Sequence, residues 1–387
     1  MEVKKERLLY IDNIRLLVIV LVVVQHLAVT YSGMGSWYYK EGAALDLASY
    51  IGFGFYESLM QSYLMGLLFL IAGYFVPKSC DSKGFQKFIN DRMVRLGVPA
   101  LIYMLIINPL MLYFELGGFA GIYPDFWHYY AGGYLGNLSF LSGSGPLWFV
   151  IVLLFFSAVY GAVPQKEPFG KKELNPTTKN IWFLIFIIAV LAFLIRLAAP
   201  AGASYYNFLL GYFAQYIVLF IAGVLAYRYD LFAKISYESG RRWLICGIIV
   251  GSVSWFVLMG ASGGWLLLMG DGGAPVNMDA MNGGFTWQSA AFSLWESAVA
   301  IAIDIGLITV FREKLNRQNK FVKALSDSSF AVYVFHPPVI IGAALLFGPV
   351  ELPPAAKFAI MVVICLPLVF LAAYYVVRRI PLLKKVM

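Results

Sequence analysis

The sequence predicts an all-α membrane protein, a bundle of about ten transmembrane helices, and three observations lead to this fold class. Hydrophobic residues make up 61% of the 387 positions and charged residues only 13%, far outside the range of soluble domains. Apolar runs long enough to cross a bilayer recur along the chain. Lys and Arg concentrate in alternate connecting loops, as topology signals do. We therefore expect a single transmembrane domain over residues 1–387.

Ten apolar runs define the predicted spans. The first is too long for a signal-peptide core and no small-residue cleavage site follows it, so we retain it as a permanent helix. We find no internal repeat of the kind that builds inverted-repeat transporters. The predicted spans are 8–30, 51–75, 94–115, 146–163, 180–199, 211–228, 243–261, 287–311, 329–348 and 356–377.

The positive charges assign the two sides of the membrane. Of the 29 Lys and Arg residues, 26 fall on the side that holds both chain ends, and only Lys40, Arg196 and Lys357 fall on the other. The positive-inside rule therefore predicts cytoplasmic termini, and we expect a multi-pass protein of a bacterial-type plasma or inner membrane. The formal net charge of +8 is dispersed over short loops, which argues against nucleic acid as a partner.

The first span carries three ionisable residues on one face. Arg15 and His26 are eleven positions apart, close to three whole turns, so their side chains lie on one helix face about 16 Å apart. Asp12 falls on the same face. Ionisable groups at membrane depth usually face a protein interior or a wet cavity. The alternative is that Asp12 and Arg15 extend to the interface while His26 is a hydrogen-bonded packing residue.

Polar residues of the other spans sort into two layers by depth. Near the cytoplasmic face we place Asp12, Arg15, Asp304 and His336, backed by Arg92 and Arg95 at the start of the third span. Nearer the outer face we place His26, Glu57, Gln61 and Glu296. Glu57 lies about as deep as His26, where a carboxylate would orient the imidazole. Equal depth by chance is the other interpretation.

The ninth span has an unusual sequence around His336. Two prolines, Pro337 and Pro338, follow this histidine directly, and we expect them to break the helix there, which membrane proteins tolerate where backbone lines a cavity. The Ser and Asp residues at 326–329 are typical helix N-caps, so we expect the helix to begin near 329.

The outward segments 116–145 and 260–286 are rich in Gly and aromatic residues and contain no Lys or Arg. Such surfaces suit stacking on sugars, but interfacial aromatic belts have the same composition, and we favour the belt. Arg196, near the outer end of the fifth span, is interpreted as an interfacial residue. Gly247 and Gly251 form a small-xxx-small pattern, which predicts close helix packing.

The three Cys residues show neither metal-ligand spacing nor a redox motif, so we expect no metal site and no thiolate chemistry.

Four motifs together resemble a known family. They are Tyr10-Ile-Asp12-x-x-Arg15 with His26 after ten further residues, Phe88-x-x-x-Arg92-x-x-Arg95-Leu-x-x-Pro99, Gly145-Pro-Leu-Trp148-Phe, and Ser328-Ser-Phe-x-Val-Tyr333-x-x-His336-x-Pro338. Over nearly its whole length the chain resembles the acyltransferase-3 family of integral membrane proteins, which includes bacterial O-acetyltransferases that modify envelope polysaccharides. The chain has Ser329-Phe330 where the family often has Ser-Tyr.

The resemblance implies an acyltransferase that takes an acyl group, most simply acetyl, from a cytoplasmic acyl-CoA to a hydroxyl of an extracytoplasmic glycan or related acceptor. The implied catalytic residues are His26 as general base, Arg15 and Asp12, and Glu57 is added as a catalytic candidate because of its depth beside His26. The implied donor-binding residues are Arg92, Arg95, Trp148, Tyr333 and His336. These assignments agree with the residue chemistry, since guanidinium groups bind phosphates and an imidazole removes a hydroxyl proton at neutral pH.

A transporter or exporter of a polysaccharide or small organic anion is the alternative function, because intramembrane Asp, Arg and His also mark permeation paths. The bunching of basic residues at one inner mouth argues against it. A structural scaffold is the third possibility, although it would not need charges inside the first and eighth spans.

Overall fold

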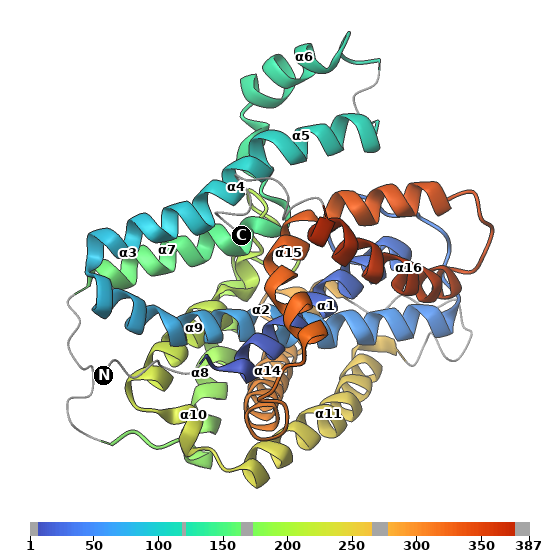
Figure 1. Ribbon diagram of the computed structural model, residues 1–387. Helices are drawn as coiled ribbons and strands as arrows, with labels where there is room; N and C mark the ends of the chain where they lie inside the picture. Colours follow the sequence, from blue (N-terminus) through green and yellow to red (C-terminus); the bar gives the residue numbers. More distant parts are fainter. Residues whose placement is uncertain (1–6, 118–120, 164–172, 265–277, 376–387) are drawn as a thin grey trace.

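The computed structural model describes residues 7–117, 121–163, 173–264 and 278–375, and within them all ten predicted spans are helical (Figure 1). These helices confirm the predicted all-α bundle, and the described residues contain no β-strand. The ten membrane-length helices are α1 (Leu9–Ser32), α2 (Leu47–Lys83), α3 to η3 (Phe85–Glu115), η6 and α7 (Gly145–Ala162), α8 (Thr178–Arg196), η7 and α9 (Leu210–Arg228), α11 and η8 (Tyr237–Gly264), α14 (Trp287–Lys314), α15 (Lys320–Phe347) and α16 (Pro354–Tyr375).

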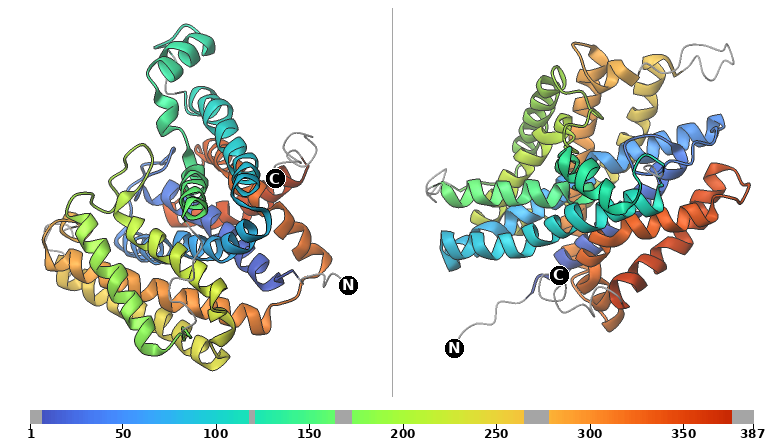
Figure 2. Two further views of the ribbon diagram at one scale, coloured as in Figure 1. Left: turned by 90° about the vertical axis from the view of Figure 1, so that its left-hand side faces the viewer. Right: turned by 90° about the horizontal axis from the view of Figure 1, so that it is seen from above.

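Helices α2 and α14 form the centre of the bundle. Helix α9 packs closely along α2. Glycine permits this approach at two positions, because a side chain at Gly73 would collide with the Phe220 carbonyl and one at Gly223 with the Leu70 carbonyl. Helix α14 packs against α8 and α11, and α1 packs against α2, α14, α15 and α16. Figures 1 and 2 show α2 crossing the bundle, with α15 and α16 on one side of it.

The predicted close packing of span seven is confirmed. A Cβ at Gly247 would lie 2.9 Å from the Ala302 Cβ, and one at Gly251 would lie 2.8 Å from a Val299 methyl carbon. Both neighbours belong to α14, so the small residues let α11 approach that helix closely.

Helix α2 extends well beyond the predicted 51–75. Asp46 caps its first turn by accepting a 2.7 Å hydrogen bond from the Ser49 backbone N–H, and these bonds lower the pKa of the Asp46 carboxyl. The added turns at both ends carry polar residues that hydropathy alone does not count as membrane-spanning.

The third span is irregular. It consists of α3 (Phe85–Arg92), α4 (Val98–Ile102) and α5 (Asn108–Leu110), joined by the π turns η1 (Met93–Gly97), η2 (Tyr103–Ile107) and η3 (Met111–Glu115). Pro99 and Pro109 each lack a backbone N–H, which disturbs the regular bonding of this helix.

An arm that projects from the bundle continues from the third span (Figures 1 and 2). It comprises α5, η3, α6 (Phe126–His128), η4 (Tyr129–Gly136) and η5 (Ser139–Ser142). Aromatic rings stack within the arm, as in the pair Tyr113 and Tyr129, whose centroids are 5.4 Å apart. Described residues of the predicted Gly- and aromatic-rich segment 116–145 also contact the third span, as where the Tyr130 hydroxyl donates to the Leu105 carbonyl at 3.0 Å. Residues 118–120 of this segment, and 265–277 of the other outward segment, lie outside the described residues.

Two expectations about the ninth span are wrong. Helix α15 begins at Lys320, where Asn319 caps it by accepting a 2.8 Å hydrogen bond from the Val322 N–H. It then continues without interruption through Pro337 and Pro338 to Phe347. The serines at 328 and 329 lie inside the helix and donate to backbone carbonyls one turn earlier. A proline pair removes only two helical hydrogen bonds, and packing against neighbouring helices keeps the rest of the helix intact.

Candidate active site

His26 of α1 and His336 of α15 are in direct contact. The distance between His336 Nε2 and His26 Nδ1 is 3.0 Å, and the ring centroids are 4.9 Å apart. This overturns the expected placement of His336 in the inner layer. Because α15 begins nine residues before the predicted boundary, His336 lies about 24 Å along its helix, at the depth that His26 reaches along α1.

The proline after His336 explains how that imidazole is held. In an unbroken helix the N–H of residue 337 would bond to the Tyr333 carbonyl, but Pro337 has no N–H. His336 Nδ1 hydrogen-bonds to the Tyr333 carbonyl oxygen instead, at a distance of 2.8 Å. Since a carbonyl oxygen only accepts, Nδ1 of His336 carries a proton.

This contact fixes the tautomer of the whole pair. A neutral His336 with its proton on Nδ1 presents an unprotonated Nε2, so His26 donates to it from Nδ1. The second ring nitrogen of His26, Nε2, is then left with a free lone pair. The described residues thus hold His26 in the form that a general base requires.

Trp37 covers the other face of His26. The two rings stack with centroids 3.9 Å apart and an interplanar angle of 24°. Trp37 belongs to the connection between α1 and α2, which carries no motif, and the sequence analysis missed it. Its position two residues beyond a loop glycine, Gly35, gives no signal that it folds back over the helix that precedes it.

Two of the sequence motifs meet beside this pair. The Tyr333 hydroxyl donates to the carbonyl of Pro146, which lies in η6, the turn directly before α7. Trp148 follows two residues later and packs on Tyr216 with ring centroids 5.4 Å apart. The Gly-Pro-Leu-Trp motif is therefore joined to the helix that carries His336.

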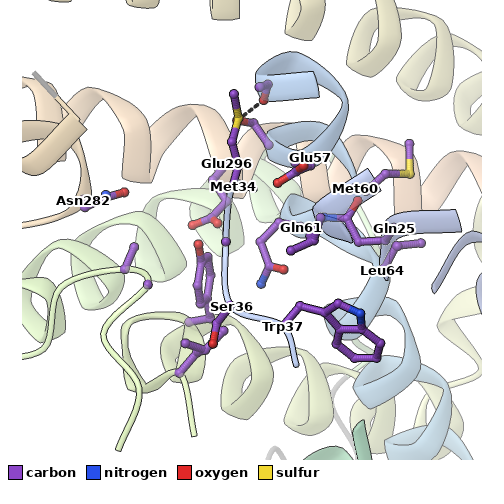
Figure 3. Close-up of a pocket in the computed structure, with 18 of the residues that line it drawn as sticks. Gln25, Met34, Ser36, Trp37, Glu57, Met60, Gln61, Leu64, Asn282 and Glu296 are labelled. Carbon is purple, nitrogen blue, oxygen red and sulfur yellow. Dashed lines mark hydrogen bonds between the residues drawn. The ribbon is translucent and has the colours of Figure 1, made fainter. Parts of the chain in front are cut away.

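His26 lines a cavity of about 950 Å³. Such a volume is typical of sites for small molecules. Figure 3 shows other residues of its wall, among them Trp37, Glu57 and Gln61. The residues of the site that line it are His26, Trp37, Tyr38, Glu57, Gln61, Pro146, Trp148, Tyr333, Asn282 and Glu296. They come from α1, α2, η6, α7, α13 (Met278–Asn282), α14 and α15 and from the connection between α1 and α2, so the cavity lies where these elements converge.

Glu57 lines this cavity, but its hydrogen-bond partner is Ser32 and not His26. Its Oε1 accepts a 2.5 Å hydrogen bond from the Ser32 hydroxyl, at the last residue of α1. The contacts of the described residues include none between Glu57 and His26. Gln61, one turn further along α2, projects into the same space (Figure 3).

Arg196 is fully buried, which corrects its interpretation as an interfacial residue. Its guanidinium forms a 2.5 Å ion pair with Glu296 and donates to the Ser293 hydroxyl and the Gly211 carbonyl. Burying a charge requires a partner of this kind. The sequence could not reveal the pair, because its members are 100 positions apart and come together only when α8 packs on α14.

The inner group, defined as Arg7, Asp12, Arg15, Arg92 and Arg95, lies at the opposite end of α1. Arg7 donates to Asp12 and, at 3.1 Å, to Asp327 of α15, and the bond to Asp12 raises the pKa of Arg7. Arg15 is 3.6 Å from Asp12 and 40% exposed.

Arg92 and Arg95 of the third span complete this group, and the charges of Arg15 and Arg95 act on the Arg92 guanidinium. Asp304, which we expected in the same layer, is buried, and neither of its carboxylate oxygens hydrogen-bonds to another described residue.

The two groups are separate in the structure. Among the described residues that line the cavity, none belongs to the inner group. The five expected donor-binding residues are accordingly divided. Arg92 and Arg95 belong to the inner group, whereas Trp148, Tyr333 and His336 surround His26. Continuous helix links the two groups, since α1 carries both Arg15 and His26.

One comparison with known proteins gives a match. The family model Acyl_transf_3, described as an acyltransferase domain, matches residues 8–377. No curated protein and no solved structure matches the chain. The matched range contains the whole inner group except Arg7, and it contains the histidine pair and the cavity. Because the family model covers nearly the whole chain, this multi-pass membrane protein belongs to the acyltransferase-3 family.

Proposed function

We propose that the protein transfers an acyl group, most simply acetyl, from a cytoplasmic acyl-CoA to a hydroxyl of an extracytoplasmic glycan, with His26 as the general base. The observation that carries the proposal is the histidine pair beside the cavity. A chain of hydrogen bonds from the Tyr333 carbonyl through His336 leaves the free lone pair on His26 Nε2, and His26 lines a cavity large enough for a sugar ring.

The inner group supports a donor that carries phosphates. Arg15, Arg92 and Arg95 bring three guanidinium groups together near the cytoplasmic end of the bundle, and such groups bind phosphate oxygens through paired hydrogen bonds. Asp12 holds Arg15 from one side. A donor bound there must extend about 16 Å along α1 to bring its thioester to His26, as the long thiol arm of coenzyme A allows.

The reaction step needs no further cofactor. His26 Nε2 takes the proton of the acceptor hydroxyl while that oxygen attacks the thioester carbonyl, and a C–O bond forms. The tetrahedral intermediate then collapses and the C–S bond breaks. His26 returns the proton to the leaving thiolate, so coenzyme A departs as a thiol and His26 is neutral again. Buried N–H groups near the imidazole, such as the Trp37 indole, would stabilise the oxyanion.

The test measures acetyl transfer by detergent-purified protein from radiolabelled acetyl-CoA to a mixture of envelope glycans. We expect His26→Ala to lower kcat/KM by about 10²-fold or more, because a general base contributes that much. Arg92→Ala should instead raise the KM for acetyl-CoA, since it removes a phosphate contact.

Lys234→Ala, on the short helix α10 (Leu231–Lys234), is the control, because this residue lies outside both groups and should keep the wild-type rate. Wild-type transfer by both His26→Ala and Arg15→Ala, at normal expression, would refute the proposal. Uptake of a glycan by proteoliposomes without any donor would favour a transporter.

A further inference from the structure

Loop 33–46, which connects α1 to α2, forms part of the cavity wall. The residues of this loop that line the cavity are Met34, Gly35, Ser36, Trp37 and Tyr38, and Figure 3 shows Met34, Ser36 and Trp37 in succession along it. Trp37 is the member that stacks on His26. A loop lacks the regular hydrogen bonds of a helix, so the position of Trp37 depends on the contacts that hold loop 33–46 in place.

The first of these contacts attaches the loop to the third span. Tyr38, the residue after Trp37, donates a 2.8 Å hydrogen bond to the side-chain oxygen of Asn108 in α5. Asn108 is buried, and its amide donates in turn to the Tyr134 hydroxyl at 2.8 Å. The loop is therefore fixed directly beyond Trp37 to a side chain that is itself fixed.

The second contact attaches the loop to α16 through an ion pair. The Lys357 ammonium donates to the Glu41 carboxylate and, at 3.1 Å, to the Gly348 carbonyl. The two side chains of the pair are only 4% and 16% exposed. The Glu41 backbone N–H also bonds to the Thr30 carbonyl in α1, at 2.9 Å. Removal of one member of a buried pair leaves the other charge buried and unpaired, so Lys357 strongly influences where Glu41 lies.

Lys357 also stands out in the distribution of charge. It is one of the three cations that the positive-inside rule places on the outer side. Of the other two, Arg196 pairs with Glu296 in the bundle, and Lys40 donates to the Gly35 carbonyl within loop 33–46. Lys357 is the member of this set that links the loop to a different helix.

From these contacts we propose that Lys357 is a positioning residue for the acyl transfer: through Glu41 it holds loop 33–46 in the conformation that keeps Trp37 stacked on His26. The inference rests on the proposed function, because it takes His26 to be the general base. The stacked indole limits rotation of the imidazole and excludes water from one of its faces. The base thereby keeps the orientation in which His336 holds it.

The kinetic test measures acetyl transfer from acetyl-CoA by purified protein. We expect Lys357→Met to lower kcat about tenfold or more, because a displaced base loses much of its contribution. The KM for acetyl-CoA should stay within about twofold of wild type, since the inner group is unchanged. Lys40→Met is the matched control. It removes an exposed lysine of the loop that forms no ion pair with another helix, and it should keep kcat within about twofold of wild type.

A double-mutant cycle tests whether Lys357 acts through Trp37. Trp37→Ala removes the stacked ring, so adding Lys357→Met to it should lower kcat by less than about twofold further, because effects that pass through one contact are not additive. A lysine with a merely structural role predicts the opposite, in which Lys357→Met lowers kcat equally in both backgrounds.

Chemical modification of His26 reports the loop position without any substrate. Diethyl pyrocarbonate modifies neutral imidazoles, and mass spectrometry of peptides gives the rate at each histidine. We expect Lys357→Met to raise the rate at His26 at least about threefold, because local opening of the loop uncovers the ring. His128, exposed in the arm, is the internal reference and should react at the wild-type rate.

The proposal is overturned if folded Lys357→Met keeps the wild-type kcat, if Lys40→Met loses as much, if the cycle is additive, or if His26 is modified no faster. Where Lys357→Met does not fold, the double substitution Lys357→Met with Glu41→Leu replaces it, because it leaves no unpaired buried charge. Failure of the proposed function would show separately, as wild-type protein that transfers no acetyl although Lys357→Met still speeds the modification of His26.

Discussion

At the scale of single residues, the site depends on two imidazoles that hold each other in one protonation pattern. His336 donates a hydrogen bond from Nδ1 to the Tyr333 carbonyl and accepts one at Nε2 from His26. His26 is in turn stacked against Trp37. Under the proposed function, His336 acts as a positioning residue, because it acts through His26.

Substitution of His336 tests this positioning role. We expect His336→Ala to lower kcat about 10²-fold with the acceptor KM within about twofold of wild type, since the base loses its orientation while the cavity keeps its shape. His336→Gln should restore transfer to within about tenfold of wild type, because its amide oxygen can accept from His26.

Steady-state kinetics on both variants, with melting curves as a check of folding, provide the measurement. A merely structural role predicts a different outcome, in which both variants lose stability and the folded fraction of each turns over at the wild-type rate.

At the same scale, Arg196 shows where sequence-based interpretation is limited. An Arg near a helix end in an apolar span has the same local sequence whether it extends to the interface or is buried. The choice depends on a carboxylate, and Glu296 is brought to it by the packing of α8 on α14. Local sequence contains no trace of that contact.

At the scale of elements, α15 shows how a helix can use proline without breaking. Pro337 leaves the Tyr333 carbonyl without its helical donor, and the side chain of His336 takes that position. The expectation of a broken helix was wrong, but its premise, that the prolines matter to the site, agrees with this contact. The proline pair thus leaves the path of the helix unchanged. Its effect is that the His336 side chain, and not a backbone N–H, hydrogen-bonds to the Tyr333 carbonyl.

Replacement of the two prolines separates these effects. Pro337→Ala restores an N–H that competes with His336 for the Tyr333 carbonyl, so we expect kcat to fall about tenfold while thermal stability stays equal or rises. Pro338→Ala is the matched control, because its N–H bonds to the Val334 carbonyl and leaves His336 undisturbed.

Acetyl transfer and melting temperature are measured on both variants. Equal rates for the two would mean that the Tyr333 carbonyl does not determine the tautomer of His336.

At the scale of the whole molecule, the bundle separates an inner group of cations from an outer cavity with carboxylates. Helix α1 joins them, because it carries Asp12 and Arg15 at one end and His26 eleven residues beyond Arg15. Under the proposed function, the inner group binds the phosphates of the donor and the cavity holds the acceptor. The separation agrees with the predicted two layers, except that His336 belongs to the outer one.

Chemical labelling of the intact cell tests the orientation of this bundle. In a background where Cys80, Cys246 and Cys365 are serine, we expect Trp127→Cys, in the arm, to react with a membrane-impermeant maleimide, because the positive-inside rule places the arm outside. Lys83→Cys, at the other end of the bundle, should react only after lysis. Labelling of both in intact cells, or the reverse pattern, would contradict the predicted topology.

The sequence by itself determined the all-α class, the ten spans, the alternation of the positive loops and the face that carries Asp12, Arg15 and His26. These features follow from the period and length of apolar runs and from residue chemistry, which are local. Only the tertiary structure decided that His336 meets His26, that Trp37 folds back over it, that Arg196 pairs with Glu296, and that the cavity walls collect Glu57 and Gln61. These features depend on how helices and one loop pack against each other, and depth along one helix does not specify which neighbour it faces.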